Sequence, residues 1–185
     1  MPSIQDAEKL LEQYVESPSL RRHCRCVAAS LAWYAAKLGE DVERWTVLGL
    51  LHDFDYEKFP EDHPRQGMEI LRGLGYDETF IRAIGSHNDA LGIPRETREE
   101  HYLFACDEIS GFCVAVSRVK PNKSIHEVDV PSVMKRLKTP AFAAGVNRDD
   151  VTQGAAEIGI DLEEHVGNIL TALQAQAENL GIQGE

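Results

Sequence analysis

The sequence predicts an all-α fold that forms a single domain. Apolar residues recur at spacings of three and four along most of the chain, which is typical of amphipathic helices. We find no convincing alternation of apolar and polar residues of the kind that marks a half-buried strand. The 185 residues suffice for one good core and are too few for two comfortable ones. We therefore expect one domain over residues 1–185.

Caps and breakers set the helices expected in the first half. Helices are predicted over residues 4–15, 18–39 and 41–52, because Ser17-Pro18 and Asp41 are typical helix starts and Gly39 a typical end. In the helix predicted over residues 18–39, His23 lies on the apolar stripe. Asp62 is expected to cap a short helix over 63–74, and Asp77 another over 79–87.

The second half is also expected to be helical. Thr97 and Glu100 form a capping box before an apolar stripe that runs to Val119. Thr139-Pro140 is expected to begin a short helix ended by Gly145, Asn147 caps another, and an amphipathic helix runs from Asp161 as far as Leu180. Three histidines in polar surroundings are expected at the surface, namely His101, His126 and His165.

The net charge limits the possible partners. With 19 basic against 31 acidic residues the chain carries a formal charge of −12, which disfavours binding to extended nucleic acid or to an anionic membrane. The N-terminal sequence resembles no leader and no apolar run is long enough to span a membrane, so a cytoplasmic protein is expected. The four cysteines lack CxxC spacing, which excludes a zinc ribbon, and are interpreted as reduced, mostly buried thiols: Cys24, Cys26, Cys106 and Cys113.

One segment is positive against this acidic background. Residues 118–138 hold six basic and two acidic residues, an excess of 6 − 2 = 4. A solvated face is the simpler interpretation, and recognition of a phosphate is the alternative. In the second case Lys120, Lys123 and Lys135 would contact the substrate.

The strongest functional signal is His52-Asp53, which ends the apolar run Leu50-Leu51. An imidazole and a carboxylate side by side are suitable ligands for a metal site without sulfur. Packing of the predicted helices could bring this pair together with four residues elsewhere in the chain, namely His23, His63, His87 and Asp107. Asp53 is the natural bridge between two ions, because each carboxylate oxygen can bind a separate metal.

The order of these six residues resembles the HD superfamily of metal-dependent phosphohydrolases, in particular its six-ligand, two-metal branch. The similarity extends over about residues 20–115 and rests on four short motifs: Gly49-Leu50-Leu51-His52-Asp53, His63-Pro64-Arg65-Gln66-Gly67, Ala83-Ile84-Gly85-Ser86-His87 and Ala105-Cys106-Asp107-Glu108-Ile109. It implies an HD-type helical bundle, a mono- or dinuclear site and hydrolysis of a phosphate ester or anhydride. Residues 121–185 would form a helical extension that carries no motif of the family.

The sequence also departs from many members of the family. Phe54-Asp55-Tyr56 follows His52-Asp53, where those members have Ile-Gly-Lys, so the usual lysine is missing and Lys58 is a candidate replacement. A Gly-Tyr-Pro signature is absent, which disfavours a cyclic-dinucleotide phosphodiesterase.

The expected reaction is attack of a metal-activated water on a small anionic phosphorylated substrate, such as a nucleotide or a phosphorylated metabolite. Asp53 and Glu57 are the candidate catalytic residues, with Asp55 as an alternative to Glu57 in the role of outer-shell partner or proton acceptor. Lys58 and Arg22 are further candidates for substrate binding. The ligand set suits iron, manganese, cobalt or zinc, in one or two copies.

Two other classes of function remain open. A di-iron oxygenase shares the fold and the ligand pattern, and would need iron and oxygen. A non-catalytic HD-type binding module is the other alternative, although such modules generally lose ligands and none is missing from this sequence. The sequence leaves the oligomeric state open.

Overall fold

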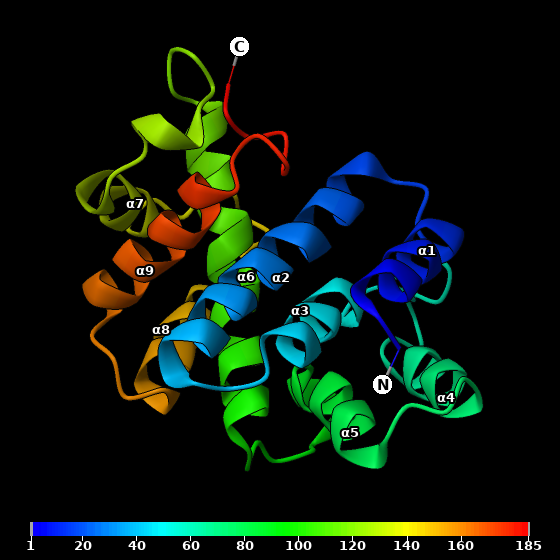
Figure 1. Cartoon of the computed structure of the whole chain (residues 1–185). Coiled ribbons are helices and arrows are strands. Elements are labelled where there is room, and N and C mark those ends of the chain that lie inside the picture. The colour runs from blue at the N-terminus through cyan, green and yellow to red at the C-terminus, as the bar shows by residue number, and fades with distance from the viewer. Residues whose placement is uncertain (1, 185) are drawn as a thin grey trace. The chain divides into compact units, whose positions relative to one another are not determined.

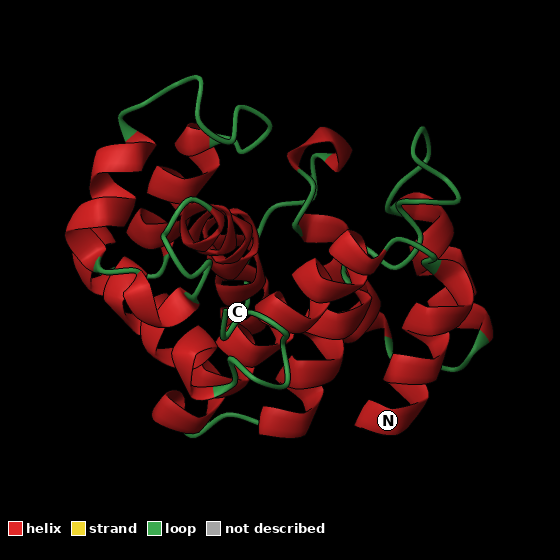
Figure 2. Ribbon diagram, turned by 90° about the horizontal axis from the view of Figure 1, so that it is seen from above, coloured by secondary structure: helices red, strands yellow, loops and turns green. Residues whose placement is uncertain are grey.

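The computed structural model describes residues 2–184, and within them it contains α-helices, two 3-10 turns and no strand (Figures 1 and 2). The all-α prediction is therefore confirmed. In these residues we find no helix long and apolar enough to cross a membrane. The α-helices are α1 (Ile4–Tyr14), α2 (Pro18–Leu38), α3 (Val42–Leu51), α4 (Arg65–Gly73), α5 (Glu78–Ser86), α6 (Arg98–Arg118), α7 (Val130–Leu137), α8 (Arg148–Glu157) and α9 (Leu162–Ala175), and the 3-10 turns are η1 (Asp89–Leu91) and η2 (Ile125–Glu127).

The chain folds as two compact units that divide between Leu103 and Phe104, within α6. In the first unit α3 packs against α1, α2 and α5, and α4 packs against α5. In the second unit α9 packs against α7, α8 and η2. All the histidines of the predicted metal site lie in the first unit.

The helix starts of the first unit follow the sequence closely. The Ser17 hydroxyl accepts the Leu20 N–H with Pro18 as the first helical residue, and Asp41 and Asp77 accept N–H groups at the starts of α3 and α5. Each of these caps satisfies backbone donors that have no partner within the helix. The predicted starts of α2, α3 and α5 are thus confirmed.

The start of α4 differs from the prediction. This helix begins at Arg65, with Pro64 in the cap position and no hydrogen bond from a capping side chain. Asp62 instead accepts a hydrogen bond from the Gln66 side-chain amide at 2.7 Å. The consequence is that His63 precedes the helix and is held by the loop, a difference that matters for the site.

Two predictions in the second unit are wrong. Residues 140–146 form turns instead of a short helix, because the Arg148 guanidinium donates hydrogen bonds to backbone carbonyls in this segment, among them those of Thr139, Phe142 and Val146. In addition, α9 ends at Ala175, before Leu180. The sequence interpretation also missed α7, whose start is a reciprocal capping box between Asp129 and Ser132.

His165 is buried, contrary to the expectation that it lies at the surface. It takes part in the apolar stripe of α9 with Ile169 and Leu173, one and two turns further on. Its Nε2 lies 2.8 Å from the Ala105 carbonyl in α6, so the ring donates this hydrogen bond. Burial lowers the pKa of His165 and the hydrogen bond to Ala105 opposes this effect, so the ring stays neutral near pH 7.

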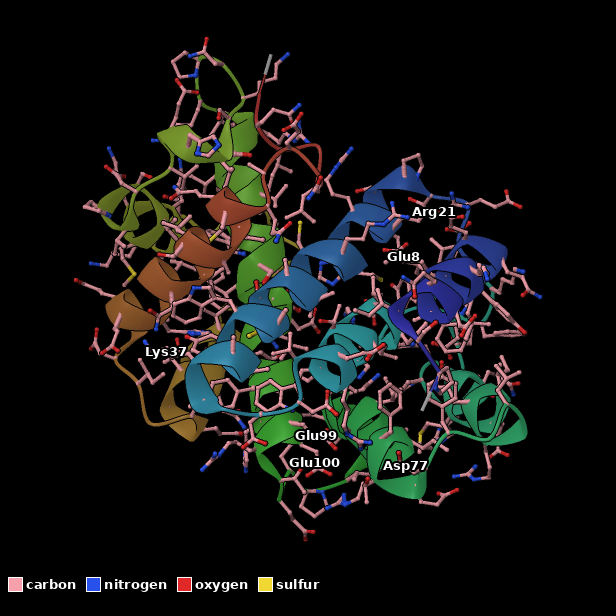
Figure 3. All side chains as sticks on the ribbon, viewed as in Figure 1. Glu8, Arg21, Lys37, Asp77, Glu99 and Glu100 are labelled. Carbon is pink, nitrogen blue, oxygen red and sulfur yellow. The ribbon has the colours of Figure 1, made fainter. Side chains whose placement is uncertain are left out.

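An arginine fastens three helices of the first unit together. Arg44 in α3 pairs with Asp77 at the start of α5 at 2.8 Å and with Glu99 in the first turn of α6 at 2.7 Å. Both acidic side chains are labelled in Figure 3. The hydrogen bond from Arg44 holds the pKa of Asp77 well below its usual range, although partial burial opposes the shift. This network fixes the end of α3 that lies opposite His52.

A close helix crossing brings α2 and α3 together (Figure 1). A Cβ atom added at Gly49 would lie 2.5 Å from the Ala28 Cα and 2.6 Å from the Ala28 nitrogen, so a residue with a side chain cannot keep this approach. Gly49 stands one turn before His52, and Ala28 little more than one turn after His23. The crossing therefore sets the separation of the two helices that carry these histidines.

We expect Gly49→Ala to lower the free energy of unfolding by about 1–3 kcal/mol, because the methyl group meets backbone atoms that cannot move aside independently. Helix propensity alone would change stability in the opposite direction, by about 1 kcal/mol in favour of alanine. Gly73→Ala is the matched control, since a Cβ at that position meets no atom within 4 Å. Urea unfolding of the three proteins measures the effect. Equal or greater stability of Gly49→Ala would show that the crossing is loose.

Candidate metal centre

The site begins with His52, which follows the last residue of α3 and is fully buried. Its Nδ1 lies 2.8 Å from the Gly49 carbonyl. A carbonyl only accepts hydrogen bonds, so Nδ1 carries the proton and Nε2 presents a lone pair. The end of the helix, where carbonyls have no partner within the helix, thus fixes the tautomer of His52.

His23 reaches the same place from α2. Its Nε2 lies 3.2 Å from Nε2 of His52 and 3.7 Å from Oδ2 of Asp53, while the His52 Nε2 lies 3.4 Å from that oxygen. The three atoms form a triangle that we call triad A: His23 Nε2, His52 Nε2 and Asp53 Oδ2. The predicted convergence of His23 on the His52-Asp53 pair is present in the structure.

A second triangle lies on the other oxygen of Asp53. His63 Nε2 and His87 Nε2 are 3.3 Å apart, and they lie 3.2 and 3.3 Å from Asp53 Oδ1. His87 follows the last residue of α5, and its Nδ1 contacts the Ile84 carbonyl at 2.5 Å, which repeats the arrangement of His52 in α3. We call this group triad B: His63 Nε2, His87 Nε2 and Asp53 Oδ1.

The two rings of triad B are oriented as metal ligands. Nδ1 of His87 donates to a carbonyl and Nδ1 of His63 faces a carboxylate, so a neutral ring in each case directs the Nε2 lone pair at Asp53 Oδ1. Three acceptor atoms this close repel one another unless a positive charge lies among them. Ligands at about 2.0–2.2 Å from one ion are themselves about 3–3.5 Å apart, which matches triad B.

The pKa values of the metal-free site also indicate that its carboxylates attract a positive charge. Burial opposes the charged ring of His63, yet the carboxylates of Asp53 and Asp55 outweigh it and raise the pKa of His63 to about 9. Burial likewise opposes ionisation of Asp53, and the neighbouring histidines still hold its pKa well below the usual range. Without a metal, the proton on His63 therefore offsets part of the negative charge of the two carboxylates.

Solvent reaches the two triads unevenly. The side chains of His23 and Asp53 are 23% and 18% exposed, whereas His52, His63 and His87 are 7% exposed or less. Ligands from the buried side would be held rigidly by the helix ends. A substrate would approach on the side of His23 and Asp53.

Asp107, the sixth predicted ligand, lies in α6 and is half-buried. It belongs to the second unit, four residues beyond the division of the chain. The adjacent Cys106 is fully buried, and burial together with the charge of Asp107 raises the pKa of this thiol well above its usual range. Cys106 is therefore an unreactive thiol, and the assignment of Asp107 as a ligand stays a prediction.

In the structure, the Glu57 and Lys58 side chains contact the residues around the junction of α1 and α2. The Glu57 carboxylate accepts the N–H groups of Glu16 and Ser17 at 3.1 and 3.0 Å, and Lys58 donates to the Gln13 carbonyl at 2.9 Å and covers the Tyr14 ring. Both side chains thus fasten the loop after His52-Asp53 to the junction of α1 and α2. These contacts favour a structural role over catalysis by Glu57 or substrate binding by Lys58.

The other predicted substrate contacts lie in both units. Arg22 is half-buried in α2, next to His23. Lys120, Lys123 and Lys135 belong to the second unit, where Lys123 and Lys135 are exposed. Their part in substrate binding stays a prediction.

Asp55, the predicted alternative to Glu57, contacts a histidine of triad B. It is fully buried, and its two oxygens lie 2.7 Å from His63 Nδ1 and 2.7 Å from the Gly67 nitrogen. The available signal was its position two residues after Asp53, since a carboxylate in an otherwise apolar environment needs partners. That Asp55 contacts His63 in particular depends on the path of the loop.

Comparison with known families supports this geometry. The family model described as the HD domain matches residues 20–111, a range that contains all six predicted ligands. Members of this family are mostly metal-dependent hydrolases. A search of the curated proteins finds no match to the chain.

Proposed function

Because the chain belongs to the HD superfamily, we propose that it is a phosphohydrolase that cleaves a phosphate ester or anhydride with two bound divalent metal ions. The expected substrate is a nucleotide or another small phosphorylated metabolite. Two findings support this proposal: the match to a family of mostly metal-dependent hydrolases, and the groups of histidine and aspartate side chains that could hold a metal ion.

The observation that carries the proposal is the division of Asp53 between the two triads. Oδ2 lies against His23 and His52, and Oδ1 lies against His63 and His87. A carboxylate that serves two ions needs this arrangement, with each oxygen among a separate set of nitrogen atoms. A site for a single ion would leave one pair of histidines without a reason to face Asp53.

The residues of the chain would act mainly by holding and orienting. His52 and His87 are fixed by carbonyls at the ends of α3 and α5, so their rings need no rearrangement when a metal binds. Bound divalent ions would supply a coordinated water of lowered pKa and withdraw charge from the phosphoryl oxygens. Asp53, which is open to solvent on one side, would orient the attacking water towards phosphorus.

We propose that an anionic substrate overcomes the net charge of −12 through local positive groups. Arg22 is a candidate because it neighbours His23 on the solvent-accessible side of α2. The lysines of the second unit are kept as further candidates. Extended nucleic acid and anionic membranes are disfavoured as partners by the same long-range field.

Nitrogen and oxygen ligands without thiolate suit iron, manganese, cobalt or zinc. To test the function, we would prepare metal-free protein by chelation, reload it separately with each of the four ions, and assay a panel of nucleotides, sugar phosphates and dinucleoside polyphosphates. We expect hydrolysis that is absent in the chelated protein and restored by at least one ion, measured as inorganic phosphate or as a shortened nucleotide product, both of which are counted below as phosphate release.

The same experiment discriminates the di-iron oxygenase alternative. An oxygenase would be restored by iron alone, and its turnover would consume oxygen and release no phosphate. Reloading and assaying under argon separates the two: hydrolysis continues without oxygen. Failure of all four ions to restore phosphate release from the whole panel, with oxygen uptake in the iron-loaded protein, would replace the hydrolase proposal.

A further inference from the structure

The Nδ1 atoms of His52, His63 and His87 each lie within hydrogen-bond distance of an acceptor. For His52 and His87 the acceptor is a neutral carbonyl at a helix end. For His63 it is the carboxylate of Asp55, at 2.7 Å. His63 precedes α4 and has no helix end of its own to fix it. Triad B thus has an additional carboxylate behind one of its ligands.

Asp55 is held in place on every side that the structure describes. Its side chain is fully buried, its second oxygen accepts the Gly67 N–H at 2.7 Å, and its backbone carbonyl accepts the Phe59 N–H. A Cβ atom at Gly67 would lie 2.9–3.1 Å from the carboxylate, so the absence of a side chain at residue 67 is what allows this approach. A buried carboxylate with both oxygens engaged has one available orientation.

We propose that Asp55 is a positioning residue that fixes His63 with Nδ1 protonated and Nε2 directed at the metal of triad B. The inference rests on the proposed two-metal function. A carboxylate behind a metal-binding histidine orients the ring and makes it a stronger donor, and losing such a partner typically costs about 10–100-fold in metal affinity. The effect is expected on triad B, because the histidine that Asp55 contacts is His63.

The isosteric replacement Asp55→Asn is a sharp test. Both oxygens of Asp55 face donors, His63 Nδ1–H and the Gly67 N–H, whereas an asparagine amide has one acceptor and one donor end. If the amide oxygen turns to Gly67, the NH₂ group faces Nδ1 and forces the proton onto Nε2, which abolishes the ligand. If the amide oxygen turns to His63, the NH₂ group faces the Gly67 N–H. Two hydrogen-bond donors then oppose each other, which is unfavourable.

We would titrate Zn²⁺ into metal-free protein in competition with a chromophoric chelator. Wild type is expected to bind two ions. In Asp55→Asn one ion is expected to bind about 10–100-fold more weakly, and the other with affinity unchanged within about 3-fold. Asp62→Asn is the matched control, because it makes the same change seven residues further along the chain, in a side chain that contacts Gln66. It should titrate like wild type.

Two further measurements keep the proposal open to refutation if Asp55→Asn folds poorly. Gly67→Ala leaves Asp55 chemically intact and displaces its carboxylate, so it should weaken the same ion selectively. In ¹⁵N-histidine-labelled, Zn²⁺-loaded wild type, the His63 ring should show a proton on Nδ1 and metal on Nε2.

The outcomes separate this inference from the proposed function. If wild type binds neither Zn²⁺ nor, in the same titration, any of iron, manganese and cobalt, the two-metal function itself is refuted. If wild type binds two ions and both Asp55→Asn and Gly67→Ala bind them with unchanged affinities, the function stands and the role of Asp55 is refuted. Zn²⁺ on Nδ1 of His63 would refute the role of Asp55 as well.

Discussion

Asp53→Ala is expected to lose both metal ions and to reduce kcat by at least about 1000-fold, which corresponds to about 4 kcal/mol of transition-state stabilisation. The reason is geometric, because Asp53 supplies one oxygen to each triad and no other residue of the first unit takes part in both. Elemental analysis of the purified protein measures the metal content. The helical circular dichroism should persist, since His52 and His87 are held by helix carbonyls and not by Asp53.

Asp62→Ala is the control for Asp53→Ala, since it removes a carboxylate from the same loop without touching either triad. It should retain the wild-type metal content. Unchanged metal content in Asp53→Ala would show that Asp53 is not a ligand. Retention of one ion would show that Asp53 serves one triad, in which case its position between the four histidines is incidental.

The double variant His63→Ala/His87→Ala is expected to bind about one ion per chain in place of two, and to lose turnover by more than about 100-fold. Both rings belong to triad B, whereas triad A keeps its two histidines and Asp53 Oδ2. The two variants therefore differ in how many ions they lose: the double variant is expected to lose one ion, and Asp53→Ala is expected to lose both.

His126→Ala provides the comparison for the double variant, because this histidine is exposed and lies in the second unit. It tests whether histidine removal in general changes the metal content, and should leave two ions bound. Full activity of the double variant on every substrate that the wild type hydrolyses would show that His63 and His87 have only a structural role. Loss of both ions would show that the two triads do not bind independently.

The sequence was sufficient for the parts of the site that depend on local rules. His52 and His87 each follow an apolar helix, and a residue at a helix end finds a carbonyl for its Nδ1 whatever the rest of the fold. The ordering of the ligands then agrees with the HD family, whose model matches residues 20–111.

What sequence reasoning missed depends on contacts between segments that local patterns do not encode. The contacts of the Glu57 carboxylate with the α1–α2 junction depend on the path of the loop, and its role as a proton acceptor stays a prediction. His165 looked polar because its sequence neighbours are acidic, while the α9 stripe buries it against Ala105.

In the proposed site, Asp53 lies between two metal ions. The most direct test is a crystal of Mn²⁺-loaded protein measured for anomalous scattering, which locates each ion independently of activity. We predict two peaks, about 3.5–4 Å apart, one within bonding distance of Asp53 Oδ2, His23 and His52 and the other of Asp53 Oδ1, His63 and His87. A single peak, or two peaks of which one is not bound to Asp53, would contradict the account.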